Sequence, residues 1–236
     1  MTTTTFVFDA YGTLFDVSAA ARELSEEPGQ EEFAQHWTTV AQVWRQKQLE
    51  YTWIHAIVGE HLDFWEVTKN ALDNALDVVM LNGKDHDELR ERLLELYWEL
   101  SAYPEATKAL EQIKEMGMNT AILSNGTPQM LDAAVKSAGI GHLLDDVLSV
   151  ETVGIFKPAG VVYELVTNRF NCVPEEVIFV SANGWDAAAA SRFGFKSCWL
   201  HRKSKAQPDR LPWKPSFVLE DLVFVPDLTR LDDASV

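Results

Sequence analysis

The chain has 236 residues, which is enough for one large hydrophobic core or for a core with a small second domain. Apolar residues make up 47% of it and aromatic residues 11%, a composition that excludes an intrinsically disordered protein. The formal net charge of -16 argues against binding to nucleic-acid backbones and to anionic membrane surfaces, which both require basic patches. We attribute the acidity chiefly to solubility.

The sequence lacks the patterns typical of membrane-spanning, secreted and metal-binding proteins. No run of 18 apolar residues is present, so no membrane span is expected, and residues 1–5 show no sign of a secretory signal peptide. The two cysteines, Cys172 and Cys198, form no CxxC motif and are typical of core residues in a reducing compartment. The six histidines show no paired spacing of metal ligands. We therefore expect a cytoplasmic protein without a cofactor or a metal.

The first apolar run ends in a carboxylate. Residues 5–8 are β-branched or aromatic and predict a short strand, and Gly12 predicts a turn just after it. Asp9 then stands at the carboxyl end of a strand, which is where open α/β sheets bind their ligands. Burying an aspartate there costs free energy unless it has partners, so a cation and hydrogen-bond donors are expected elsewhere in the chain. Capping of the next turn would be the structural explanation of the same residue.

Residues 17–100 show helical periodicity and no convincing strand. Apolar side chains recur at helical spacing at two places along this segment: Phe33, Trp37, Val40, Val43 and Trp44, and then Leu89, Leu93, Leu96 and Leu100. Asn82-Gly83 predicts a break between two helices. We interpret residues 17–100 as a helical cap subdomain inserted after the first strand, over the edge of the sheet that carries Asp9.

The remainder of the chain alternates between strand and helix patterns. Strands are predicted at 119–124, 147–150, 177–181 and 197–200, and helices at 104–116, 128–138, 158–170 and 185–192, three of which begin with proline. The tail after Glu220 is expected to be one further short helix or irregular. This alternation predicts the α/β class, with a Rossmann-like parallel sheet core made of residues 1–16 and 101–236.

Three further polar clusters follow strands of this predicted core. Ser124-Asn125-Gly126-Thr127 lies between a strand and a helix, Lys157 precedes a helix, and residues 181–186 contain Asp186 in the first turn of another helix. Each has an ordinary structural explanation, since such residues also cap helices or lie on the surface. Their recurrence at strand ends favours one shared site, in which Lys157 would keep Asp9 ionised.

Together these clusters resemble the haloacid dehalogenase superfamily, and nearly the whole chain takes part in the resemblance. Within it, Asp9-Ala10-Tyr11-Gly12-Thr13, residues 44–52, Ser124-Asn125-Gly126, Lys157-Pro158 and residues 181–186 resemble the (S)-2-haloacid dehalogenases. Phosphatases of the superfamily carry a second aspartate where this chain has Tyr11, and they bind magnesium. A departing halide needs neither a proton nor that metal, so the resemblance implies metal-independent dehalogenation through an ester on Asp9.

The resemblance also implies a role for individual residues. Asp9 would attack C2 of a short (S)-2-haloalkanoate, Arg45 and Asn125 would receive the halide, and Asp186 would activate water to release the (R)-2-hydroxy acid. The substrate would be bound by Ala10, Tyr11, Arg45, Leu49, Phe64, Ser124, Asn125 and Trp185. The supporting catalytic residues would be Thr13, Ser124, Lys157, Tyr163, Ser181 and Asn183. A homodimer is expected.

Two other functions remain open at this point. One is a magnesium-dependent phosphatase or phosphonate hydrolase of the same fold, and the other is a non-catalytic binding protein that kept the fold. Arg45 could also be a surface residue of a cap helix, and Phe64 and Trp185 could be ordinary core aromatics. Tyr163 fits a helix packing pattern as well, and Thr13 could simply cap a turn.

Overall fold

A parallel sheet forms the centre of the molecule in the computed structural model, which describes residues 2–79, 86–202 and 209–233. The described residues contribute six strands in the order β3-β2-β1-β4-β5-β6, every neighbouring pair being parallel. The strands are β1 (Thr5–Phe8), β2 (Asn119–Ser124), β3 (Asp146–Ser149), β4 (Val177–Ser181), β5 (Lys196–Leu200) and β6 (Phe217–Leu219). The α/β class and the parallel sheet predicted from the sequence are therefore confirmed.

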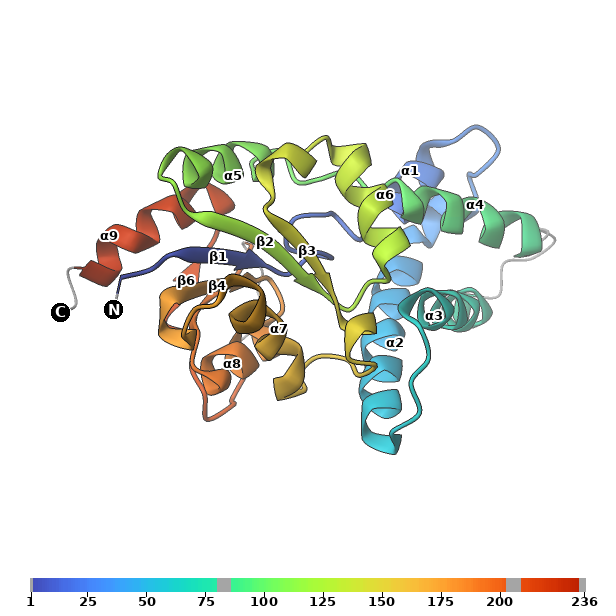
Figure 1. The fold of residues 1–236 in the computed structure, drawn as a ribbon. Coiled ribbons are helices and arrows are strands. Elements are labelled where there is room, and N and C mark those ends of the chain that lie inside the picture. Colours follow the sequence, from blue (N-terminus) through green and yellow to red (C-terminus); the bar gives the residue numbers. More distant parts are fainter. Residues whose placement is uncertain (1, 80–85, 203–208, 234–236) are drawn as a thin grey trace.

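The four central strands are buried on both sides. β1 and β4 have no exposed residue, which explains why their sequences are nearly continuous apolar runs rather than alternating ones. In Figure 1, α5 (Ala106–Glu115) and α6 (Pro128–Ala138) cover one face of the sheet, and α7 (Gly160–Phe170) and α8 (Gly184–Phe193) cover the other. The helices change face because the chain moves from β1 towards β3 and then returns to β4. The neighbours β1 and β4 therefore flank the point where ligands bind in such sheets.

The α-helices between β1 and α5 lie beyond the carboxyl ends of the strands (Figure 1). They are α1 (Ala19–Glu26), α2 (Trp37–Val58), α3 (Phe64–Val79) and α4 (His86–Trp98). No strand occurs among the described residues of this segment, as its periodicity predicts. The proposed break at Asn82-Gly83 falls outside the described residues. The boundaries of the cap at 17 and 100 stay a prediction.

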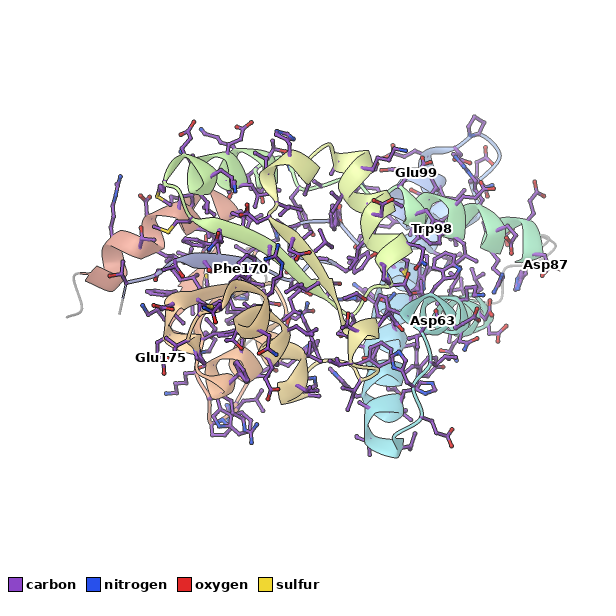
Figure 2. The ribbon with its side chains drawn as sticks, viewed as in Figure 1. Asp63, Asp87, Trp98, Glu99, Phe170 and Glu175 are labelled. Carbon is purple, nitrogen blue, oxygen red and sulfur yellow. The ribbon has the colours of Figure 1, made fainter. Side chains whose placement is uncertain are left out.

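The chain leaves the sheet edge before α1 and returns to it after α4. Asp87, in the first turn of α4, lies at the outer edge of the molecule (Figure 2). At the other end of α4, Trp98 packs on Trp65 of α3 with 4.7 Å between ring centroids. The next residue, Glu99, accepts a hydrogen bond through its carbonyl oxygen from Ser137 Oγ of α6 at 3.3 Å. The α4 helix is therefore attached to the core at its carboxyl end.

Several predicted boundaries need correction. The helix predicted at 104–116 begins at Ala106, the one at 158–170 begins at Gly160, and the strand predicted at 147–150 is shifted one residue towards the N-terminus. Leu100 lies beyond α4, and Phe33 belongs to a 3₁₀ turn. Lys157-Pro158 is a cis peptide bond outside α7, so that proline is not the first helical residue.

Two features near the C-terminus were incompletely predicted. β6 was not predicted, because its three residues at the edge of the sheet give too short a pattern. After Glu220, a 3₁₀ segment at Leu222–Asp227 leads into α9 (Leu228–Asp233).

Cys198 is buried as expected, but Cys172 is only half-buried, and both thiols are free. Within the described residues, no helix has the length and apolar character that crossing a bilayer requires.

Candidate active site

Asp9 follows β1 directly and is only 6% exposed. Its Oδ1 accepts a hydrogen bond from Lys157 Nζ at 3.1 Å. Its Oδ2 accepts from Thr13 Oγ1 at 3.0 Å and from Asn183 Nδ2 at 2.9 Å. One cation and two neutral donors therefore offset the cost of burying this carboxylate at the sheet edge.

A tight turn after Asp9 brings Thr13 back to the carboxylate. The amides of Thr13, Leu14 and Phe15 all donate to the carbonyl oxygen of Ala10. Gly12 has φ of 92° in this turn, a conformation that residues with a Cβ rarely adopt. Thr13 Oγ1 in addition accepts from the backbone N–H of Ala182 at 2.8 Å. Thr13 thus contacts Asp9 and joins the turn to the chain that follows β4.

Lys157 lies between two carboxylates in the interior of the protein. Its Nζ donates to Asp9 Oδ1 and, at 2.9 Å, to Asp186 Oδ2, and the side chain is 1% exposed. Burial alone would lower the pKa of Lys157, but the charges of Asp186 and Asp9 outweigh it and hold the pKa above its ordinary value. The ammonium group is therefore charged, and it lies between the two carboxylates.

Asp186 is fully buried in the first turn of α8, and its carboxylate does not cap that helix. Oδ1 accepts from Tyr163 Oη at 2.7 Å, while Oδ2 accepts from Ser181 Oγ at 3.0 Å as well as from Lys157. Burial raises the pKa of Asp186, and the nearby charge of Lys157 opposes this rise. A carboxylate with a raised pKa is a stronger base than an ordinary aspartate.

The polar residues at and after the end of β2 have two different structural roles. Thr127 Oγ1 accepts from the backbone N–H of Met130 at 3.3 Å and so caps α6. Asn125 Oδ1 accepts from the backbone N–H of Lys157 at 3.0 Å, and Ser124 Oγ accepts from that of Gly126 at 3.1 Å. A Cβ on Gly126 would approach the Tyr11 ring to 2.8 Å, which explains the glycine. Capping therefore accounts for Thr127, whereas Ser124 and Asn125 lie beside the other polar groups.

Arg45 reaches this site from α2. Its Nη2 donates to the carbonyl oxygen of Tyr11 at 3.1 Å and to Asn183 Oδ1 at 3.3 Å, and its Nη1 donates to Gln48 Oε1 at 2.7 Å. Asn183 thus touches both Asp9 and the guanidinium group. Arg45 is not a surface residue, and it brings a second cation to the carboxyl edge of the sheet.

A small cavity lies among these groups. Its walls are formed by Asp9, Tyr11, Arg45, Leu49, Phe64, Ser124, Asn125, Lys157, Asn183 and Trp185. Its volume is about 10 Å³, which is room for about one water molecule. Ala10 is fully buried but is not one of the lining residues. The other residues expected to bind substrate all line the cavity, while Thr13, Tyr163, Ser181 and Asp186 lie behind its polar wall.

Three polar residues that connect to Arg45 were not predicted from the sequence, namely Gln48, Thr68 and Tyr97. Gln48 of α2 is 1% exposed, and its Nε2 donates to Thr68 Oγ1 at 2.7 Å and to Tyr97 Oη at 3.1 Å. A signal was present, because Gln48 continues the stripe of buried residues formed by Val40 and Trp44 at intervals of four. A glutamine on the buried face of a helix indicates a buried hydrogen-bond network.

Within the described residues, no group of three histidine, cysteine, aspartate or glutamate side chains is arranged to hold a metal ion. The arrangement instead offers a buried carboxylate facing a cavity, a second carboxylate suited to act as a base, and two fixed cations. Such a set is suited to a nucleophilic displacement that expels an anion, followed by hydrolysis of the resulting ester.

Comparison with known proteins agrees with this chemistry. The model of the haloacid dehalogenase-like hydrolases matches residues 3–194. An (S)-2-haloacid dehalogenase 4A from Burkholderia cepacia is 41% identical over 197 residues, which cover 84% of this chain and 82% of that protein. An (S)-2-haloacid dehalogenase from Pseudomonas fluorescens is 37% identical over 216 residues, with 92% of each chain covered. A solved L-2-haloacid dehalogenase from Xanthobacter autotrophicus, with chloropropionic acid covalently bound, superposes with a TM-score of 0.84 at 35% identity, covering 97% of this chain and 98% of that one.

Proposed function

The chain belongs to the (S)-2-haloacid dehalogenases, within the haloacid dehalogenase-like hydrolases, and we propose that Asp9 is the nucleophile with which it hydrolyses short-chain (S)-2-haloalkanoic acids. The enzyme is thus a hydrolase acting on carbon–halogen bonds. The products are an (R)-2-hydroxyalkanoic acid and a halide ion. The observation that carries the proposal is the Lys157 ammonium group held between Asp9 and Asp186, because it unites a charged nucleophile with a buried base.

In the first step Asp9 attacks C2 of the substrate from the side opposite the halogen. A C–O bond forms as the carbon–halogen bond breaks, and the halide leaves with the electron pair of that bond. Arg45 and the Nδ2 group of Asn125 stabilise the departing anion, and Trp185 lines the same cavity with an indole N–H that has no partner among the described residues. Phe64 adds the positive edge of its ring, and Leu49 contacts the alkyl group. Ser124 and the backbone amides of Ala10 and Tyr11 hold the substrate carboxylate.

In the second step water hydrolyses the ester on Asp9. Asp186 takes a proton from the water, whose oxygen attacks the ester carbonyl carbon and not C2, so that C2 is inverted only once. The bond between the carbonyl carbon and the ester oxygen then breaks, and the alkoxide of the product takes the proton that Asp186 removed from water. The attacking oxygen stays in the carboxyl group of Asp9, whose remaining proton passes to solvent. Tyr163 and Ser181 orient Asp186, while Thr13 and Asn183 orient Asp9. One of the oxygen atoms of Asp9 is therefore exchanged in each turnover.

The decisive experiment is a single turnover in ¹⁸O-water with enzyme in excess over (S)-2-chloropropionate. We expect the label in the peptide that contains Asp9, and unlabelled oxygen in the first lactate released. Label found only in lactate would contradict a covalent intermediate on Asp9.

A second assay separates this function from magnesium-dependent phosphate hydrolysis. Chloride release from each enantiomer of 2-chloropropionate is measured with and without excess EDTA, beside phosphate release from p-nitrophenyl phosphate. We expect chloride from the (S)-enantiomer at the same rate in EDTA and no phosphate. Phosphate release that EDTA abolishes, without chloride release, would overturn the proposal.

We further propose that the enzyme is a cytoplasmic homodimer. Trp53, Ile54, Ile57 and Val58 form an exposed apolar patch at the carboxyl end of α2, and Ile57 is 84% exposed. Apolar groups gathered on a surface in this way are typical of interfaces between proteins. The free thiols of Cys172 and Cys198 are compatible with a reducing compartment.

A further inference from the structure

Gln48 connects Arg45 to the interior of α2, α3 and α4. Its side-chain oxygen accepts from Arg45 Nη1, and its side-chain nitrogen donates to Thr68 of α3 and Tyr97 of α4. All three of these hydrogen bonds are 3.1 Å or shorter, so both ends of the amide are held. Gln48 therefore ties the guanidinium group to three helices at once.

The hydrogen bonds of Thr68 fix which end of the amide faces Arg45. The hydroxyl proton of Thr68 is donated to the carbonyl oxygen of Phe64 at 2.7 Å, so Thr68 Oγ1 can only accept from Gln48. Turning the amide over would place its NH₂ group against the guanidinium and its oxygen against the lone pairs of Thr68. Only one orientation satisfies every donor, and it presents an acceptor to Arg45.

The same network reaches the cavity at a second point. Phe64, whose carbonyl oxygen accepts from Thr68, also lines the cavity, and its ring lies 5.7 Å from that of Tyr11. The Tyr97 ring stacks on Tyr11 at 5.7 Å. The Gln48 amide that contacts Arg45 is therefore also linked, through Thr68 and Tyr97, to Phe64 and Tyr11, which line the cavity.

Packing alone does not explain a glutamine at this position. Along the buried stripe it lies between Trp44 and Thr52, and burying an amide costs free energy that an apolar side chain of similar size would not. Arg45 is a long, flexible side chain that loses conformational freedom when it is held in one geometry. An acceptor fixed beside it supplies that restriction before the substrate binds.

We propose that Gln48 is a positioning residue that holds the Arg45 guanidinium where the departing halide forms. The inference rests on the proposed role of Arg45 as the halide acceptor. Through Nη1, Gln48 fixes one edge of the planar group, and Nη2 is left to exchange its contacts with Tyr11 and Asn183 for the halide. Gln48 itself does not line the cavity.

The test compares Gln48→Met and Gln48→Glu with Gln46→Met, which changes an exposed glutamine of the same helix. Halide release is followed in single turnovers with (S)-2-chloropropionate and (S)-2-bromopropionate, and inhibition by bromide ion is measured. For Gln48→Met we expect about a tenfold slower release of chloride, the order of effect of one hydrogen bond to a charged group. Bromide, the better leaving group, should be released with a smaller loss, and bromide ion should inhibit more weakly.

Gln48→Glu separates positioning from packing. Glutamate is closer in shape to glutamine than methionine is, so a packing role predicts that Gln48→Glu is the milder change. Positioning predicts the reverse, because a carboxylate beside Arg45 neutralises the charge that stabilises the halide. Gln46→Met should match the wild type in every measurement, and circular dichroism checks that each variant is folded.

Failure of this inference is distinguishable from failure of the proposed function. If Arg45→Lys alters the bromide-to-chloride rate ratio and both Gln48 variants leave it and the bromide inhibition unchanged, Gln48 only fills space. If Arg45→Lys itself leaves the ratio and the inhibition unchanged, the assignment of the halide to Arg45 is wrong. If the Gln48 variants alter them as described and Arg45→Lys does too, the proposal stands.

Discussion

Lys157 is the residue on which both carboxylates of the site depend. Its ammonium group donates a hydrogen bond to each of them and so offsets the free-energy cost of burying two carboxylates close together. With it, Asp9 can act as a nucleophile while Asp186 acts as a base. The two roles differ because Asp9 lines the cavity and Asp186 does not.

Replacing Asp186 with asparagine should separate the two steps. In the proposed mechanism, halide release depends on Asp9 and Arg45, whereas hydrolysis of the ester depends on Asp186. The Asp186→Asn variant should therefore release about one halide per active site and then stop. We expect kcat to fall by about 10²–10⁴-fold, the usual contribution of a general base. Mass spectrometry should find a substrate-sized addition on Asp9, whereas Asp132→Asn, at an exposed position of α6, should turn over normally. An Asp186→Asn variant with normal turnover would exclude Asp186 as the base.

The raised pKa of Asp186 determines how activity responds to acid. The base works only when ionised, so activity is lost as pH falls through its pKa, which burial places above the ordinary 3.8. The hydrogen bond from Tyr163 lowers the pKa of Asp186, so Tyr163→Phe should move the acid limb of kcat to higher pH. The measurement is the pH profile of both enzymes with (S)-2-chloropropionate. An acid limb at the same pH in both would mean that Asp186 does not set it.

At the scale of single elements, the residue that caps the N-terminus of the α6 helix can be tested separately from the candidate site. Thr127 caps its N-terminus, and Gly139 ends it in the left-handed conformation with φ of 67°. Thr127→Ala should lower the free energy of unfolding by about 1 kcal/mol, because the backbone N–H of Met130 loses its acceptor. Urea denaturation measures this, with Thr127→Ser as the control that keeps the oxygen. A fall in kcat with no change in stability would mean that Thr127 belongs to the site.

The strands of the core were predictable because they are buried on both faces. β1, β2 and β4 have the predicted boundaries, and each reads as an apolar run ended by a polar residue. Helix starts were less accurate, since the prolines at 104 and 158 precede their helices instead of opening them. A proline indicates that a helix is near, but hydrogen bonds decide where it begins.

The candidate site was predictable in a different way. Asp9, Ser124, Asn125 and Asn183 follow strand ends, and the topology of the sheet brings such positions together at one edge. Arg45 could be assigned only through the resemblance, because periodicity does not tell which side of a helix faces the sheet edge. Gln48 was missed because its partners, Thr68 and Tyr97, are 20 and 49 residues away in the chain. Contacts of that kind depend on how the helices pack together.

At the scale of the whole molecule, the exposed end of α2 is where we expect the second subunit. Ile57→Lys should weaken the dimer by an order of magnitude or more, because it replaces an apolar side chain that the interface would bury. Sedimentation velocity over a range of concentrations measures the change. Val78→Lys, at an exposed apolar position of α3, alters the charge equally and should leave the dimer intact. A monomeric wild type would reject the proposed dimer.

The volume of the cavity has a consequence for substrate affinity. A space that holds about one water molecule is too small for a haloacid, so we expect substrate to bind the fraction of molecules in which the helices beyond the strand ends have separated from the sheet. If that fraction is small, the apparent dissociation constant exceeds the intrinsic one by the same factor. Contacts between the two parts, such as His61 with Glu151 and Trp53 with Trp185, then oppose substrate capture. Substitutions that loosen this closure should therefore raise the apparent affinity for substrate without altering the chemistry.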